Sequence, residues 1–265
     1  MRFSFMRPYT VRDMTYLIAF TFFALGSVLA SFTAVIAERL HTGQSWVSGR
    51  SRCNSCSREL SALDLVPVLS WLVFRGRCRT CSARVPALYA LSEFLLGSVF
   101  ALSYLKLGLT LPLVPLLIAF AVLTFIVLYD LRHTVVPSVS STLLIAFSLL
   151  YAMLSMGAGA QLGLALMVAG VISLGFFLLY ALSRGRAMGL GVAPVALALS
   201  ILVGGSLAVP GLLFSFWIGA LVGIAILAMT PKGHRMGIEV PFVPFLAAGY
   251  LLAFFTQWNP LFLTL

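Results

Sequence analysis

The sequence predicts an all-α polytopic membrane protein with about eight transmembrane helices. Hydrophobic residues make up 61% of the 265 residues, charged residues only 9%, and the mean hydropathy is +1.08. Runs of about 20 apolar residues, the length that spans a bilayer, follow one another along most of the chain. Because backbone polar groups in lipid must be paired within their own segment, we expect the spans to be helices. This composition excludes a soluble globular domain.

Eight apolar runs form the predicted spans. The first follows a short basic tail, Met1 to Asp13, and no signal peptide is evident before it. The break between the sixth and seventh spans rests on Pro210 and on a hydrophobic run that is too long for one helix. The predicted spans are 15–38, 85–105, 110–129, 139–157, 160–182, 191–208, 209–229 and 240–257.

A single sizeable polar segment, residues 39–84, separates the first two spans and contains all four cysteines. They are arranged as Cys53-x-x-Cys56 and Cys78-x-x-Cys81. A two-residue gap lets both thiolates of a pair bind one ion, and two such pairs complete a tetrahedral site. The 21 residues between the pairs slightly exceed the usual zinc-ribbon spacing. Four thiolates leave no open coordination position, so the predicted Zn²⁺ is structural and no catalytic metal is implied.

Two other interpretations of the cysteines are two disulfides and four unrelated thiols. Two disulfides would require an oxidising compartment. The distribution of basic residues instead predicts that this loop faces the cytoplasm, which favours the zinc site.

The net charge of +10 does not indicate nucleic-acid binding, because the basic residues mark loops between spans instead of forming a stripe. The odd-numbered loops hold thirteen Lys and Arg residues and the even-numbered loops hold only Lys106. By the positive-inside rule the odd-numbered loops face the cytoplasm and both termini face outward. The basic tail, with Arg2, Arg7 and Arg12, runs against this rule. The thirteen are Arg39, Arg50, Arg52, Arg58, Arg75, Arg77, Arg79, Arg84, Arg132, Arg184, Arg186, Lys232 and Arg235.

Asp130 is the sharpest candidate for a functional carboxylate, because an ionisable group at membrane depth is costly to keep. It ends the apolar run 121–129 and is followed by Arg132 and His133. We expect it at the cytoplasmic rim of the third helix. The alternative is a helix-end carboxylate paired with one of these two neighbours.

Five further polar or conformationally special residues complete the set. Gly189 and Gly191 flank one residue at the start of the sixth span, where they permit a close backbone approach or a special turn. Membrane helices also use glycine freely for packing. Pro241 and Pro244 open the last span, and Glu93 lies in the second. Each of these can also be explained by structural packing or pairing.

Taken in order, these segments resemble the type IV prepilin peptidases, the bifunctional leader peptidases and N-methyltransferases of pilus and type II secretion systems. Residues 26–32, Gly-Ser-Val-Leu-Ala-Ser-Phe, and 36–40, Ile-Ala-Glu-Arg-Leu, are similar to the family's Gly-Ser-Phe-x-Asn-Val-x-x-x-Arg-Leu stretch. The cysteine loop carries Asp-Leu-Val-Pro-Val-Leu-Ser-Trp at 64–71 and Arg-Gly-Arg-Cys-Arg-Thr-Cys at 75–81, with Glu93 beyond it. This loop is highly specific.

The membrane part carries the rest of the resemblance. Asp130 followed by Pro137 resembles the first aspartate motif, and Gly189-Leu-Gly191 resembles the family's Gly-x-Gly-Asp. Residues 241–246, Pro-Phe-Val-Pro-Phe-Leu, resemble its closing Pro-Phe-Gly-Pro-Phe. The likeness therefore extends along almost the whole chain.

The resemblance implies an intramembrane aspartic endopeptidase of the bacterial inner membrane. Two carboxylates at cytoplasmic helix ends would share a proton and activate a water. The water would attack the peptide bond after the leader of a prepilin or pseudopilin, just before its hydrophobic helix. The second implied activity is methylation of the new amino terminus by S-adenosylmethionine, linked in the family to the cysteine loop. The expected parts are the tail and first helix (1–38), the zinc-binding loop (39–84) and a seven-helix peptidase domain (85–265).

The chain departs from the family pattern at the second aspartate, where it has Val192. A valine can neither hold the shared proton nor polarise water, so loss of most peptidase activity is expected. Ala193 and Pro194 stand where Val-Lys is common, Ser138 where an aspartate is frequent, and Ala34 where the family has asparagine.

Several explanations of Val192 remain open. The chain is either an inactivated peptidase made for study or a natural chain that has lost the dyad. Alternatively, Glu239, which we expect on the same cytoplasmic face, replaces the missing acid if the fold brings the sixth and eighth helices together. A non-catalytic membrane protein that binds pilin-like helices is the main alternative. A transporter is a weaker one, because Asp130 and Glu93 make no continuous polar path.

Overall fold

The computed structural model describes residues 11–42, 45, 49–186, 188–229 and 240–260. The chain divides into two compact units, Met1–Thr110 and Leu111–Leu265. Regular structure in the described ranges is helical, apart from two isolated β-bridges in the cysteine loop. The predicted all-α class is therefore confirmed.

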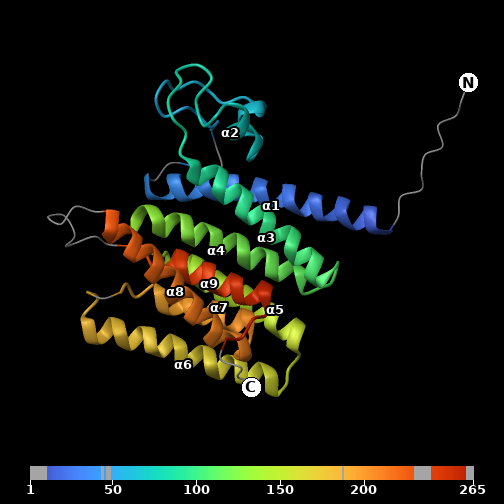
Figure 1. Cartoon of the computed structure of the whole chain (residues 1–265), viewed down its shortest axis with the longest axis vertical. Coiled ribbons are helices and arrows are strands. Elements are labelled where there is room, and N and C mark those ends of the chain that lie inside the picture. The colour runs from blue at the N-terminus through green and yellow to red at the C-terminus, as the bar shows by residue number, and fades with distance from the viewer. Residues whose placement is uncertain (1–10, 43–44, 46–48, 187, 230–239, 261–265) are drawn as a thin grey trace, which may run out of the picture. The chain divides into compact units, whose positions relative to one another are not determined.

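The first unit is an antiparallel helix pair with the cysteine loop between its two members. The helices α1 and α3 run side by side, and the loop with the short helix α2 lies at the carboxyl end of α1 (Figure 1). Gly26 and Gly97 allow this close packing, because a Cβ on Gly26 would lie 2.7 Å from the Leu96 carbonyl oxygen. The elements are α1 (Val11–Thr42), η1 (Ala62–Leu65), α2 (Leu69–Val73) and α3 (Ala87–Leu107).

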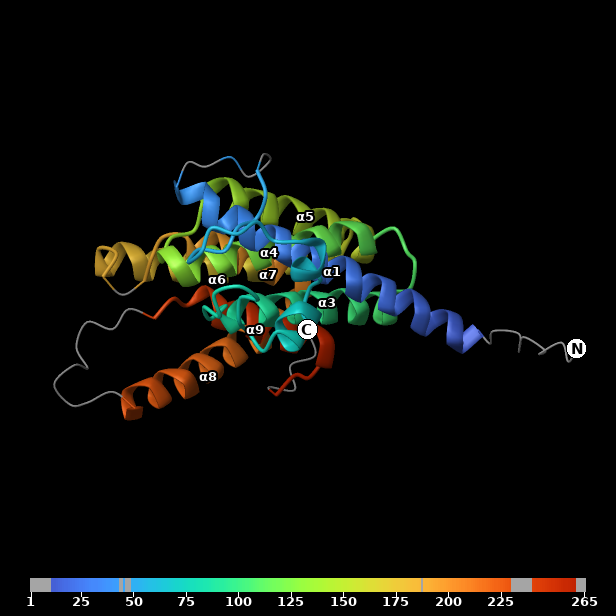
Figure 2. The same ribbon diagram turned by 90° about the horizontal axis from the view of Figure 1, so that it is seen from above.

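The second unit is built around the short helix α7, which packs against α5, α6, α8 and α9. All residues of α7 except Pro194 and Leu197 are buried. The buried residues of α8 all lie in its first half, and its carboxyl-terminal part extends away from the other helices of this unit (Figure 2). The elements are α4 (Leu113–His133), α5 (Ser138–Met156), α6 (Ala160–Ser183), α7 (Val192–Val203), α8 (Gly205–Met229) and α9 (Val243–Thr256).

Each of the eight predicted spans corresponds to a helix, but not every helix has the length of a span. In the described part of the chain, α1, α3, α4, α5, α6 and α8 are long and apolar enough to cross a membrane. The apolar helices α7 and α9 have only 12 and 14 residues. The first residues of these two helices, Val192 and Val243, are both buried.

The predicted break at Pro210 was wrong, because α7 ends at Val203, Gly204 follows it as the C-cap residue, and Pro210 lies inside α8. Gly204 has φ 84°, a left-handed value that glycine adopts without a Cβ clash, and its N–H donates to the Ser200 carbonyl. A proline removes one helical hydrogen bond, but membrane helices tolerate that loss. The glycine, and not the proline, therefore separates the two helices.

Candidate functional site

The four cysteines lie on two turns of the same construction. In the first, the Cys53 N–H donates to the Arg58 carbonyl at 2.9 Å, and the Ser57 N–H donates to the Cys53 carbonyl at 2.9 Å. The second turn, within 77–84, repeats both bonds from Cys78. The serine after each Cys-x-x-Cys has a φ of 56°. Two equivalent turns therefore present two thiols each.

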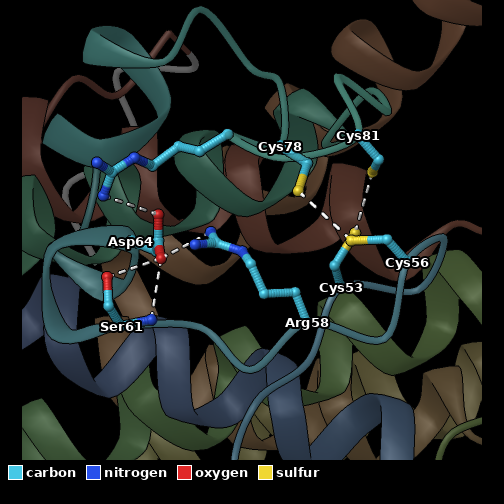
Figure 3. Close-up of polar contacts among 8 residues, drawn as sticks. Cys53, Cys56, Arg58, Ser61, Asp64, Cys78 and Cys81 are labelled. Atoms are coloured by element: carbon cyan, nitrogen blue, oxygen red, sulfur yellow. Dashed lines mark hydrogen bonds and ion pairs between the residues drawn. The ribbon is translucent and has the colours of Figure 1, made fainter.

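The four sulfur atoms are gathered at the spacing of a metal centre (Figure 3). The Sγ atoms of Cys53 and Cys81 are 3.8 Å apart, those of Cys56 and Cys78 are 4.0 Å apart, and all four lie within 4.8 Å of one another. Sulfurs bound tetrahedrally to zinc at about 2.3 Å lie about 3.8 Å from each other. A disulfide needs about 2.0 Å. The arrangement fits one four-coordinate ion and does not contain the two disulfides.

The backbone around the cysteines favours a thiolate at the first cysteine of each pair. Backbone N–H groups of Cys56 and Ser55 lower the pKa of Cys53. N–H groups of Cys81 and Thr80 hydrogen-bond to the Cys78 sulfur and lower its pKa to about 6. The Ala83 N–H lowers the pKa of Cys81, but burial and the neighbouring thiols outweigh it and raise that pKa to about 11. Filling the site with a metal ion therefore releases protons, so metal affinity rises with pH.

Glu93 of α3 holds the cysteine loop onto the helix pair. Its Oε2 accepts a hydrogen bond from the Val68 N–H at 2.7 Å, and its carbonyl accepts one from the Ser27 hydroxyl of α1 at 3.0 Å. Val68 has φ 62°, so the loop backbone turns sharply at the point where it meets the carboxylate. Glu93 is buried. It therefore links α1, α3 and the loop.

A cavity of about 290 Å³ lies between the loop and the helix pair. Its lining includes aromatic side chains, Glu38 of α1 and residues of both cysteine turns. The Tyr89 hydroxyl donates to Glu38 at 3.3 Å within this lining. The lining includes Glu38, Cys53, Trp71, Phe74, Cys78 and Tyr89.

Asp130 lies in the last turn of α4 and faces the beginning of α9. Asp130 is only 5% exposed, and its carboxylate accepts a hydrogen bond from the N–H of Val243. Val243 is the first residue of α9, where free N–H groups and the helix dipole favour a negative charge. Oδ2 has no hydrogen-bond partner among the described residues. One carboxylate oxygen is thus available for a further donor.

Val192, the position aligned with the second aspartate motif, is the first residue of α7 and is buried. Gly191 approaches the α4–α5 connection so closely that a Cβ would lie 2.6 Å from Val136 Cβ. Pro137, the next residue, caps the start of α5. The start of α7 therefore lies beside the segment that follows Asp130. Gly189 has no atom within 4 Å of such a Cβ, so the close approach requires glycine only at the second position.

Comparison with known proteins agrees with this arrangement. Residues 24–107 match the family model described as the bacterial peptidase A24 N-terminal domain. The chain is 27% identical over 232 residues to a prepilin leader peptidase/N-methyltransferase of Bacillus subtilis, covering 88% of this chain and 92% of that protein. The chain is therefore similar to prepilin leader peptidases along most of its length, and its first part matches their amino-terminal domain.

A second relative covers less of the chain. A prepilin leader peptidase/N-methyltransferase of Myxococcus xanthus is 33% identical over 121 residues, which are 46% of this chain and 36% of that protein. No solved structure matches the chain. The similarity to these peptidases therefore consists of the matched domain and of sequence identity that reaches into both units.

One contact at these sites cannot be found by inspecting motifs, whereas another feature has a signal that the motif analysis did not use. The contact between Asp130 and Val243 joins residues far apart in sequence, and no local pattern marks it. The serines after the cysteine pairs, Ser57 and Ser82, do have a signal, because Cys-x-x-Cys-Ser occurs twice. Glu239 lies outside the described residues, so its predicted position on the same face has no structural counterpart.

Proposed function

We propose that this chain is a prepilin leader peptidase/N-methyltransferase by descent, whose peptidase centre lacks one of two carboxylates. Similarity over 88% of the chain to a relative of that name carries the proposal. The substrates would be prepilins or pseudopilins, each with a leader followed by a hydrophobic helix. The location would be the bacterial inner membrane, with the cysteine loop and helix ends in the cytoplasm, as the thirteen basic loop residues favour.

In the peptidase reaction, Asp130 is the surviving acid of a GxGD-type aspartic pair. A complete pair shares one proton, because two adjacent carboxylates do not both ionise easily. The ionised member takes a proton from the attacking water, and the protonated member donates to the substrate carbonyl oxygen. Val192 can do neither, so Asp130 alone is a base without its acid. The unpartnered Oδ2 supports this assignment, since it is the atom at which a shared proton would be held.

The cysteine centre supports a structural zinc ion held by Cys53, Cys56, Cys78 and Cys81. The cavity beside it is the candidate location for S-adenosylmethionine, which when bound supplies an electrophilic methyl group to the new amino terminus. Its aromatic side chains suit a planar base and Glu38 suits a cationic group, so the lining fits this cofactor. Methylation does not require Val192, and this activity can persist when cleavage is lost.

The alternative function is a non-catalytic membrane protein that binds pilin-like helices. Val192 itself favours it, because a buried valine keeps the start of α7 apolar. An apolar groove of about 460 Å³ between α6 and α7 also begins at Ala193, the next residue, and continues past Ser173 and Phe177. A helix could lie in this groove without being cleaved.

The deciding experiment uses purified chain, the Val192→Asp variant and the Val192→Asp/Asp130→Asn double variant. Cleavage of a prepilin-type leader peptide is followed by mass shift. We expect only Val192→Asp to cleave, at a rate about 10²–10⁴-fold above the other two, the usual contribution of one acid–base group.

Each other outcome has its own meaning. Cleavage by the unmodified chain would show that another acid replaces position 192, with Glu239 as the first residue to test. If the folded Val192→Asp variant binds the peptide without cutting it, the pilin-binding function is supported instead.

A further inference from the structure

Asp64 makes the densest set of polar contacts in the cysteine loop (Figure 3). Its Oδ2 accepts hydrogen bonds from the Ser61 N–H at 2.9 Å, the Ser61 hydroxyl at 2.8 Å and the Arg58 guanidinium at 2.9 Å. Its Oδ1 lies 3.9 Å from a guanidinium nitrogen of Arg79. The Asp64 side chain is only 7% exposed.

The two arginines come from different cysteine turns. Arg58 follows Cys56 by two residues on the first turn, and Arg79 is next to Cys78 on the second. Arg79 is also held over the Phe74 ring, with 4.9 Å between the guanidinium carbon and the ring centroid. Asp64 therefore bridges the two turns through side chains that bind no metal.

The bridge relies on a carboxylate that remains ionised. Burial raises the pKa of Asp64, but the two Ser61 hydrogen bonds and the charges of Arg58 and Arg79 outweigh it, and the net shift is downward. A partly buried carboxylate with several donors forms stronger contacts than an exposed ion pair. At neutral pH the bridge is therefore fully charged.

Glu59 provides the contrast within the same loop. It contacts Arg50 at 3.4 Å and Arg52 at 3.0 Å, and both of these arginines belong to the first turn or precede it. The Glu59 side chain is 45% exposed. Glu59 therefore joins the first turn to itself and not to the second.

We propose that Asp64 is a positioning residue for the metal centre, holding the two cysteine turns together before a metal ion arrives. Each turn supplies two of the four ligands. If the turns separate in the metal-free loop, they must come together again before a metal ion can bind all four sulfurs. The apparent dissociation constant equals the intrinsic one divided by the fraction of loops already assembled. Asp64 raises that fraction and slows metal loss.

The test compares the full-length chain with Asp64→Asn and with Glu59→Gln, each purified in detergent and loaded with zinc. Zinc affinity is measured by chelator competition, and zinc release is timed after excess chelator is added. Cobalt is substituted in parallel, because its absorption bands report whether all four sulfurs are bound. We expect Asp64→Asn to weaken zinc binding by about 10–100-fold, the usual effect of losing an outer contact of a metal site. Its cobalt spectrum should be unchanged, and Glu59→Gln should alter affinity by less than about 2-fold, as expected for an exposed ion pair.

Arg79→Gln keeps the contacts of Asp64 with Ser61 and Arg58, and it removes the link from Asp64 to the second turn together with the Arg79–Phe74 contact. It should also weaken zinc binding, to a smaller extent than Asp64→Asn, and it decides the question if Asp64→Asn does not fold. Zinc binding by Asp64→Asn and Arg79→Gln equal to or tighter than that of Glu59→Gln would overturn the proposal. If the unmodified folded chain binds no zinc, the metal site falls together with this proposal, whereas the peptidase assignment at Asp130 is unaffected.

Discussion

Two carboxylates in this chain, the partly buried Asp64 and the buried Asp130, have opposite surroundings. Asp64 belongs to the loop whose four cysteine sulfurs gather at the spacing of a metal centre, and its Oδ2 accepts three hydrogen bonds from Ser61 and Arg58. Asp130 meets the start of α9, keeps Oδ2 without a partner among the described residues, and has Val192 where the family has a second acid. The candidate metal centre therefore has all four ligands of a structural zinc site, whereas the proposed peptidase centre lacks one of its two carboxylates. The proposed function then predicts that cleavage can be lost while the metal centre stays intact.

The largest effect is expected from a substitution in the four-cysteine centre, the site that has all of its ligands. Cys53→Ser removes one of four ligands, so bound zinc should fall from about one per chain to below about 0.2, and the loop should unfold locally. Zinc content by mass spectrometry and limited proteolysis within residues 39–84 measure both changes. Ser55→Ala is the matched control, because it lies between two ligands and changes a side chain that binds no metal.

The helices of the second unit should remain folded in Cys53→Ser, since they contribute no ligand. A well-folded unmodified chain with less than about 0.2 zinc would contradict the metal site, because a structural site is normally filled. In that case the cysteine loop would lack its metal, just as the proposed peptidase centre lacks its second carboxylate.

A structural feature could be predicted from the sequence when a short stretch of the chain determines it, and not when it depends on contacts between distant residues. The helices follow from apolar runs and the metal centre from two short cysteine motifs, and both were found without knowledge of tertiary contacts. The break between the sixth and seventh spans was predicted at 208–209 from Pro210 and from the length of the hydrophobic run, but the helix ends before Gly204, whose φ is 84°. The contact between Asp130 and Val243 depends on how α4 and α9 pack, which no spacing encodes.

A second prediction concerns the close contact between the start of α7 and the α4–α5 connection, beside the proposed peptidase centre. Gly191→Ala places a methyl group against Val136, so we expect it to lower the free energy of unfolding by about 1–3 kcal/mol, as overpacking usually does. Gly189→Ala, two residues away, meets no atom within 4 Å and should change it by less than about 0.5 kcal/mol. Thermal unfolding in detergent compares the two.

A compensating variant sharpens this comparison. Val136→Ala should recover stability in the Gly191→Ala background more than it changes the unmodified chain, because the two side chains compete for one space. Equal effects of the two glycine substitutions would mean that α7 does not begin against the α4–α5 connection. Position 192 would then be too loosely held for Val192→Asp to complete a pair.

The smallest expected effect lies deeper in the same unit, where α7 meets α9. The hydroxyls of Ser200 and Tyr250 are 2.7 Å apart, and both residues are almost fully buried. Ser200→Ala leaves the Tyr250 hydroxyl without this partner and should lower the free energy of unfolding by about 1 kcal/mol. Tyr250→Phe should cost less, because a helical serine can bond a carbonyl of its own helix instead. The double variant tests whether the two hydroxyls are coupled. It should lower the free energy of unfolding by about as much as Ser200→Ala alone, as expected of two groups that share one hydrogen bond. If the losses of the two single variants instead add, the pair is not coupled, and α7 and α9 are joined by apolar packing alone.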